Sequence, residues 1–302
     1  MEGRQQRIID LHIHSTCSDG AKEPLELIDM AANSGVDTIA IADHDTVKAY
    51  TPQLYDYAIS KGVQLLTAVE VSTKLNGKIG IHILGYNFDP NNKELNEMLY
   101  QSRNSRHIYL EKVAEALNRL GYVVRVADLD KVDAVTKAHI ALDIVTNPAN
   151  EELLLTNFKH IPSKGEFIET IMNEGCPAYV LKPSISPQYA GEVIKRAGGK
   201  VVIAHPVAYV YEDGIGEDEI SSLIEEMRPF GLEANYIYAD RNDRIIDECD
   251  RWRKVASKYN LVATIGSDYH NTDNIRPEIG LINTNLRLTN EEINLILSKL
   301  CN

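Results

Sequence analysis

The sequence predicts an α/β fold, a distorted seven-stranded β/α barrel with a helical insertion, and three observations support this prediction. Short apolar runs rich in β-branched residues alternate with helical stretches, which is the pattern of parallel β/α units. Seven such runs occur, and several are apolar almost throughout, as in strands that are buried on both faces. The alternation stops between about residues 91 and 189, where helical periodicity continues without a clear strand.

The barrel strands are expected in the order in which the apolar runs occur along the chain. They are RIIDLHI (7–13), TIAIA (38–42), VQLLTAVEVS (63–72), GIHILGYNF (80–88), KVVIA (200–204), LEANY (232–236) and LVATIG (261–266). Two of the helices between and after them have recognisable ends. Pro24 suits the first turn of a helix that Gly35 closes, and Thr289-x-x-Glu292 has the spacing of a capping box at the start of the last helix.

The middle of the chain is predicted to be a helical insertion, residues 91–189, between barrel segments 7–90 and 190–302. Its first part predicts one long helix over 91–121, ending at Gly121. The apolar residues roughly on one stripe of this helix are Leu95, Leu99, Val113, Leu117 and Leu120. Two shorter helices are expected over 135–145 and 165–175.

Composition and charge narrow the class of protein. With 302 residues, 44% apolar and 25% charged, the chain matches a globular enzyme with a sizeable core. A net charge of −13 argues against binding long duplex nucleic acid through a basic face, although metal ions can still attract small phosphorylated substrates. Scattered cysteines, no secretory signal and no long apolar run predict a cytoplasmic protein without a membrane partner.

Histidines and carboxylates gather at the ends of the predicted strands. The nine residues are His12, His14, Asp19, His44, Glu70, His82, His205, Asp268 and His270. In β/α barrels this rim carries the functional site, and imidazole with carboxylate suits Zn²⁺, Mn²⁺ or Fe²⁺. Any single histidine here is readily explained as a solvated strand-end residue. The whole set favours a site for two or three divalent ions, because independent strands agree.

The motifs HIHSTCSDG, TIAIADHDT, AVEVS, IHILGYNF, VVIAHP and IGSDYH resemble those of the PHP (polymerase and histidinol phosphatase) phosphoesterases in order and spacing along the chain. This resemblance implies a distorted seven-stranded barrel with three metal positions. The first would use His12, His14, Glu70 and Asp268; the second Glu70, His82 and His205; the third Asp19, His44 and His270.

The insertion resembles that of the subgroup acting on nucleotides, which implies substrate-binding roles for Arg103, Arg106 and His139 of KAHIA. Lys137 stands where that subgroup's pattern suggests arginine. Arg103 and Arg106 are three residues apart, so one helix face would present both guanidinium groups for bidentate contact with phosphate. The alternative is that both are ordinary exposed charges on a helix.

The resemblance implies a phosphoric monoester hydrolase that releases phosphate from a nucleoside 3′,5′-bisphosphate or 5′-monophosphate. A hydroxide shared by the metal ions would attack phosphorus, and Asp268 or His205 would manage protons. The alternatives within the enzyme class are a histidinol-phosphate phosphatase and a 5′–3′ exonuclease on short oligonucleotides. The alternative of another class is a non-catalytic module that binds metal and phosphate.

Overall fold

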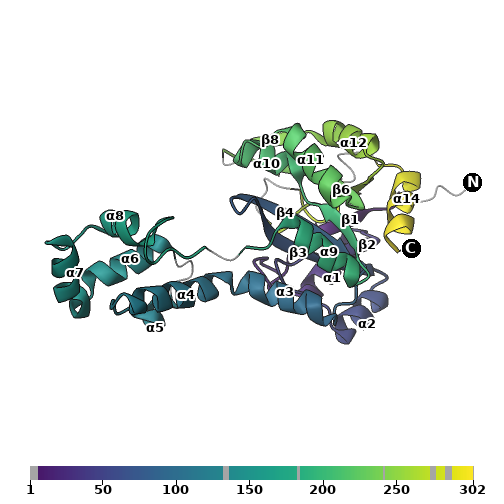
Figure 1. The fold of residues 1–302 in the computed structure, drawn as a ribbon. Helices are drawn as coiled ribbons and strands as arrows, with labels where there is room; N and C mark the ends of the chain where they lie inside the picture. Colours follow the sequence, from purple (N-terminus) through teal and green to yellow (C-terminus); the bar gives the residue numbers. More distant parts are fainter. Residues whose placement is uncertain are drawn as a thin grey trace, which may run out of the picture. The chain divides into compact units, whose positions relative to one another are not determined.

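The computed structural model describes residues 6–131, 136–181, 184–240, 242–272, 277–282 and 288–301 (Figure 1). The chain divides into two compact units. The larger contains Met1–Tyr100 and Ile185–Asn302, and the smaller contains Gln101–Ser184. The larger unit is built on a seven-stranded sheet, and the smaller unit is helical throughout its described secondary structure.

The sheet contains every strand that the sequence predicts. It is formed by β1 (Ile9–Ile13), β2 (Thr38–Ile41), β3 (Gln64–Leu75), β4 (Ile79–Tyr86), β5 (Lys200–Ile203), β6 (Gly231–Asn235) and β9 (Val262–Ile265), in the spatial order β1-β2-β3-β4-β5-β6-β9. Past β9, His14 N donates to Tyr269 O and Asp268 N donates to His12 O, both over 2.8 Å. These bonds bring the last strand back to the first, so the barrel is nearly closed.

Strand β4 departs from the parallel pattern, because it runs antiparallel to both β3 and β5. Asn76 and Gly77, with φ of 52° and 70°, form the tight turn between β3 and β4. Positive φ at both central residues is the geometry of a two-residue hairpin turn, whereas a parallel connection needs a dozen or more residues. As a result the early part of β4, with His82 paired opposite Ser72, lies beside the second half of β3.

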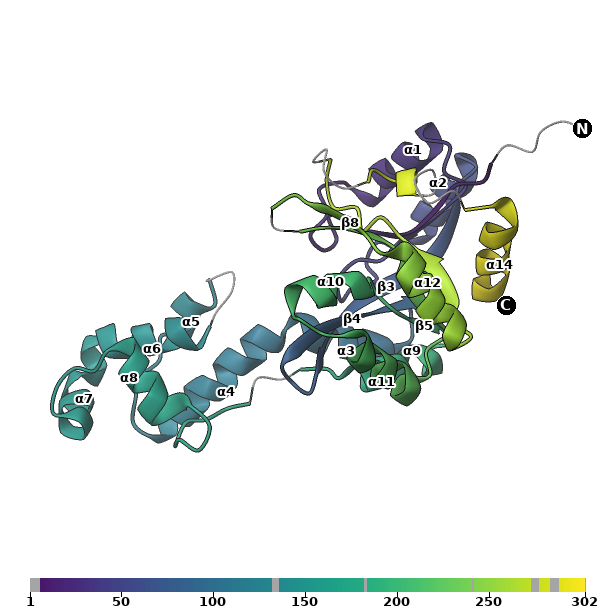
Figure 2. The same cartoon turned by 90° about the horizontal axis from the view of Figure 1, so that it is seen from above.

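Helices surround the strands of the larger unit (Figure 2). They are α1 (Pro24–Asn33), α2 (Pro52–Ser60), α3 (Lys93–Arg103), α9 (Pro187–Arg196), α10 (Pro206–Glu212), α11 (Glu217–Met227), α12 (Cys249–Lys258) and α14 (Asn290–Cys301). The predicted helix ends are present: Pro24 begins α1, and the Thr289 hydroxyl accepts from Glu292 N while Glu292 Oε2 accepts from Thr289 N. No described helix is long and apolar enough to cross a bilayer.

The smaller unit has its own apolar core. It contains α4 (Ser105–Arg119), α5 (Val126–Leu129), α6 (Lys137–Thr146), α7 (Glu151–Phe158) and α8 (Lys164–Phe167), with a π-helical turn at Ile168–Met172. Leu110, Val113, Ile140 and Phe167 are among its fully or almost fully buried side chains. Helix α6 matches the expected segment 135–145 from Lys137 onward, and residue 135 lies outside the described residues. In the expected segment 165–175, the short α8 and the π turn reach Met172.

The prediction of one continuous helix over 91–121 is wrong. Helix α3 ends at Arg103, and Asn104 (φ −90°, ψ 5°) separates it from α4. Leu95 and Leu99 of the expected stripe pack in the barrel core, whereas Val113 and Leu117 pack in the core of the smaller unit. One apolar stripe therefore serves two separate cores, and asparagine favours a turn over a helix interior at the point between them.

Candidate metal centre

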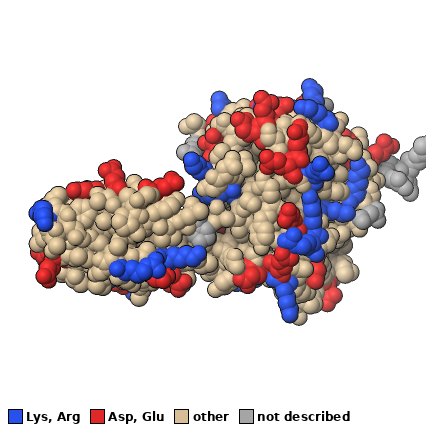
Figure 3. Space-filling view, in the orientation of Figure 1, with Lys and Arg blue, Asp and Glu red and all other residues tan. Residues whose placement is uncertain are grey.

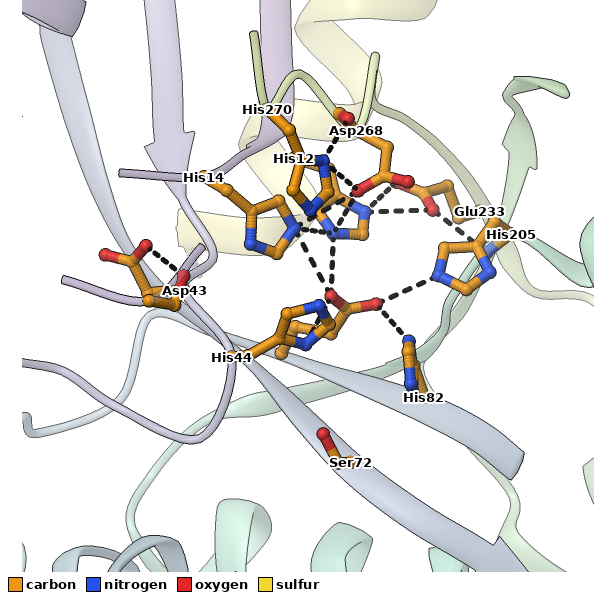
Figure 4. A network of polar contacts seen from close by, with 12 residues as sticks. His12, His14, Asp43, His44, Ser72, His82, His205, Glu233, Asp268 and His270 are labelled. Carbon is orange, nitrogen blue, oxygen red and sulfur yellow. Dashed lines mark hydrogen bonds and ion pairs between the residues drawn. The ribbon is translucent and has the colours of Figure 1, made fainter. Parts of the chain in front are cut away.

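The nine side chains singled out at the strand ends come together at one rim of the barrel. Figure 4 labels His12, His14, His44, His82, His205, Asp268 and His270 among them. Their possible ligand atoms form three groups, within each of which all atoms lie within 4.8 Å of one another. The groups are His12, His14, Glu70 and Asp268; His14, Asp19, His44 and His270; and His44, Glu70 and His82. His205 joins them through Glu70. The sets expected from the resemblance therefore overlap closely with those in the structure.

Local backbone geometry aims these side chains at the rim. His12 and His14 are two residues apart at the end of β1, so both project from the same side of the strand. Asp268, just past β9, has a positive φ of 55°, and His205, just past β5, has φ 19° and ψ 62°. Such sparsely populated conformations cost energy and are held only when surrounding contacts fix them, which is common at functional sites.

Glu70, fully buried in β3, lies at the centre of the cluster. Its Oε2 lies 3.3 Å from the Nε2 atoms of His12 and His14 and 3.1 Å from Nδ1 of His44. Its Oε1 lies 2.9 Å from both His82 Nδ1 and His205 Nε2. One carboxylate thus faces five imidazoles.

This donor set fits divalent cations. His12 Nε2 and His14 Nε2 lie 3.1 Å apart, so only one hydrogen fits between them. Both nitrogens also lie 3.3 Å from the Glu70 carboxylate. Among the described residues, Glu70 Oε2 and His14 Nδ1 are buried without a hydrogen-bond partner. An unsatisfied buried polar group costs about 1–3 kcal/mol. Cations among these nitrogens and oxygens would remove that cost.

Burial and charge act against each other in the cluster. Burial alone lowers the pKa of His14, but the nearby carboxylates of Asp268 and Glu70 raise this pKa to about 9. Burial raises the pKa of Glu70, whereas the surrounding histidines, His82 foremost, bring it well below its usual value. Burial lowers the pKa of His44 to about 4. The carboxylates are therefore ionised at neutral pH, and His44 is neutral with a lone pair to offer.

The loop after β1, which carries Asp19, is held by Asp43 at the end of β2. Asp43 Oδ1 accepts from Ser15 N over 2.7 Å and from Ser18 Oγ over 2.6 Å, and its Oδ2 accepts from Ser15 Oγ over 2.6 Å. Asp43 thus holds the loop at Ser15, where the loop begins, and at Ser18, which directly precedes Asp19. The sequence placed Asp43 next to a candidate ligand, His44, without indicating this contact.

Two functional residues in or after β6 were not singled out in the sequence. Glu233 contacts His12 Nδ1, and the Tyr236 hydroxyl donates to Asp268 Oδ2 over 3.3 Å. Both lie in the run LEANY, which was expected to be one of the barrel strands. An acidic residue in such a strand needs a buried partner, and this is the signal that points to Glu233.

A cavity of about 470 Å³ opens beside the cluster. Its lining includes Glu70, His82, His205, Asp268, Tyr209 and Tyr238. Tyr209 is 4% exposed, and its hydroxyl accepts from His82 N over 2.8 Å. Its ring lies 5.3 Å from that of His205. Tyr209 therefore packs the wall behind two of the histidines.

The residues expected to bind substrate lie in the helices of the insertion. Arg103 ends α3 and Arg106 lies in α4, so the prediction that a single helix presents both is wrong. The side chain of Arg106 lies outside the described part of the structure. His139 is in the first turn of α6, where its Nδ1 accepts from Thr136 N over 3.2 Å as part of a capping box. Lys137 Nζ donates to Asn173 Oδ1.

Comparisons with known proteins show the family of the chain and its fold. Residues 10–174 match the PHP domain. The chain is 30% identical to a 5′-3′ exoribonuclease of Haemophilus influenzae, over 86% of this chain and 89% of that protein. It is 28% identical to a 3′,5′-nucleoside bisphosphate phosphatase of Chromobacterium violaceum, over 87% of each. A crystal structure from Bifidobacterium adolescentis, 22% identical, covers 97% of this chain and 96% of its own with a TM-score of 0.61, and so shares the fold.

Proposed function

The chain belongs to the PHP domain family of metal-dependent phosphoesterases, and on that premise we propose that it is a phosphoric monoester hydrolase acting on small nucleotides. The substrates are nucleoside 3′,5′-bisphosphates or 5′-monophosphates. The observation that carries the proposal is the set of nine metal-competent side chains around Glu70, beside a cavity of about 470 Å³. Cavities of about 300–1,000 Å³ are the size that binds small molecules.

We assign two or three divalent ions, Mn²⁺, Fe²⁺ or Zn²⁺, to the cluster. His12, His14, Glu70 and Asp268 would hold the first; Glu70, His82 and His205 the second; and Asp19, His44 and His270, with His14, the third. Divalent ions bound there would supply positive charge to the phosphoryl oxygens.

The chain's own groups place the substrate and handle its protons in this proposal. Asp268 and His205 line the cavity, and we assign to them the protons that pass to and from the reacting oxygens. The Tyr236 hydroxyl, which also lines the cavity, holds Asp268 Oδ2 in place. Buried side chains such as Tyr209 limit how much water surrounds the reacting phosphate.

A small substrate is favoured over a long nucleic acid. The chain has a net charge of −13, and on the face shown in Figure 3 acidic and basic side chains of the larger unit are interspersed. The relative from Chromobacterium violaceum is named for nucleoside bisphosphates, which supports this choice. The second candidate is a 5′–3′ exonuclease on short oligonucleotides, favoured by the name of the relative from Haemophilus influenzae.

The first test is a competition between substrates. The purified chain with Mn²⁺ is given adenosine 3′,5′-bisphosphate, AMP, histidinol phosphate and a short 5′-phosphorylated oligonucleotide. We expect the highest kcat/KM for one of the two mononucleotides, with release of inorganic phosphate that chelator abolishes. Faster turnover of histidinol phosphate, or release of mononucleotides from the oligonucleotide at a higher kcat/KM, would reject the proposed substrate in favour of that alternative.

The arginines at the start of the insertion provide a second test. Replacing Arg103 or Arg106 by Ala is expected to raise KM for AMP by roughly 10- to 150-fold with a smaller change in kcat, because a charge-assisted hydrogen bond to phosphate contributes about 1.5–3 kcal/mol. The matched control is Arg119→Ala, which removes an exposed arginine of α4 paired with Glu115. Unchanged KM in both variants would remove the arginines from substrate binding.

A further inference from the structure

Glu233 is a fully buried carboxylate that lies beside His12 and His205 (Figure 4). Its two oxygens lie 3.0 and 3.1 Å from His12 Nδ1. Its Oε2 also accepts from the backbone N–H of His205 over 2.9 Å. One side chain of β6 therefore contacts His12 in β1 and His205 just after β5, and each of these histidines is assigned to a different metal position.

The contact with His12 determines which nitrogen of that ring faces the cluster with a lone pair. Both carboxylate oxygens of Glu233 face Nδ1, and carboxylate oxygens accept hydrogen bonds, so the hydrogen of the ring lies on Nδ1. The other nitrogen, Nε2, lies 3.3 Å from Glu70 Oε2 and 3.5 Å from Asp268 Oδ1. When Nδ1 donates to Glu233, the neutral ring has its lone pair on Nε2, where a cation would bind.

The contact with His205 acts on the backbone. His205 directly follows β5 and has φ 19° and ψ 62°, outside the main allowed regions. A buried hydrogen bond from its N–H to a carboxylate helps to fix this conformation, and with it the direction of the imidazole toward Glu70. Glu233 thus constrains the direction of one ligand and the tautomer of another.

The space around this contact is closed on the side of β9. A Cβ atom added to Gly266 would lie 2.2 Å from His12 Cβ and 2.4 Å from Glu233 Oε1. The glycine therefore allows the backbone after β9 to pack directly against the pair, which leaves the ring and the carboxylate little room to move.

We propose that Glu233 is a positioning residue of the metal centre, which fixes the tautomer of His12 and the backbone of His205 so that both rings face the cations. The proposal rests on the metal positions proposed above, and it does not depend on which phosphoester is hydrolysed.

The test is Mn²⁺ binding by the purified chain without substrate, with free Mn²⁺ measured by electron paramagnetic resonance. Glu233→Gln keeps the shape but leaves one acceptor oxygen for two donors, Nδ1–H and the His205 N–H. We expect its Mn²⁺ Kd to rise about 10- to 100-fold, the usual effect of losing a carboxylate behind a histidine ligand. The matched control is Asp143→Asn, which removes a buried carboxylate that pairs with Arg125 in the smaller unit, and it is expected to keep the wild-type Kd.

The outcomes separate the possible roles of Glu233. If Glu233→Gln unfolds more readily but binds Mn²⁺ with the wild-type Kd and stoichiometry, Glu233 is structural and the proposal is overturned. Glu233→Asp, which keeps the charge but shortens the reach, is expected to bind with an intermediate Kd and carries the test if the Gln variant does not fold. Wild-type protein that binds Mn²⁺ but hydrolyses no nucleotide would reject only the proposed substrate, whereas failure to bind Mn²⁺ at all would overturn both the metal assignment and this proposal.

Discussion

Glu70→Gln is expected to lower phosphate release by more than about 100-fold, beyond the 10- to 100-fold effect of residues that only orient metal ligands. The carboxylate faces five imidazoles with its two oxygens, and Glu70 takes part in two of the three candidate metal groups. The Gln side chain has no charge to balance a cation. The NH₂ group of Gln would replace one of the two carboxylate oxygens that face the histidine nitrogens, and this group donates hydrogen bonds but cannot bind a cation. At least one metal ion should therefore be lost.

The measurement is the steady-state rate with saturating Mn²⁺, together with the metal content of the dialysed protein. Glu166→Gln is the matched control, because Glu166 pairs with His160 on the surface of the smaller unit over 3.0 Å. This variant should keep both the rate and the metal content. A Glu70→Gln protein with the wild-type rate and metal content would show that Glu70 is not a ligand and would overturn the proposed metal positions.

The barrel could be predicted from the sequence because its strands are buried on both faces. Runs such as TIAIA and KVVIA are apolar almost throughout and do not alternate between apolar and polar residues. Short runs of this kind between helices indicate strands that are covered on both faces. The antiparallel hairpin from β3 to β4 was not predicted, although Asn-Gly at positions 76 and 77 is a dipeptide that favours a tight hairpin turn. The two-stranded sheet of β7 (Ile237–Ala239) and β8 (Ile245–Asp247) was not predicted. Strands of three residues are too short to establish an alternating pattern.

The prediction of one continuous helix over 91–121 was wrong for a different reason. Periodicity reports that one face of a helix is buried, but it does not report what buries it. The apolar residues before and after Asn104 form one helical stripe in the sequence. In the structure, those before Asn104 pack in the barrel core and those after it pack in the core of the smaller unit. The break also places Arg103 and Arg106 on separate helices, which no spacing rule within a single helix anticipates.

The candidate ligands could be found because parallel strands end at the same rim, so residues far apart in sequence share a position relative to their strands. Residues that contact a candidate ligand without being one, such as Glu233, do not lie at a fixed place relative to the end of their strand. Glu233 meets His12 across 221 residues of sequence. Only the folded barrel, in which β6 pairs with β9 and the segment after β9 returns to β1, brings them together. The sequence shows that Glu233 is an acidic residue in a predicted strand, but it does not indicate that His12 is the partner of this carboxylate.

Removing divalent ions is expected to lower the Tm of the larger unit by roughly 5–10 °C and to abolish phosphate release. Ions that bind only the folded chain stabilise it by about 2.7 kcal/mol at 100 times Kd. For domains of about 150–250 residues, 1 kcal/mol corresponds to roughly 2–4 °C. The measurement is thermal unfolding of protein dialysed against chelator, followed by stepwise addition of Mn²⁺.

The chain carries its own reporter for this experiment. Trp252 is the single tryptophan, it is 1% exposed, and it lies in α12 within the barrel core. All nine candidate ligands belong to the same unit as Trp252, whereas the smaller unit contains none of them. Tryptophan fluorescence should therefore show the full shift with Mn²⁺, and Glu70→Gln should show a smaller one. A Trp252 transition that does not move with Mn²⁺ would mean that the cluster holds no metal in the folded barrel, because binding to the native state alone must raise its Tm.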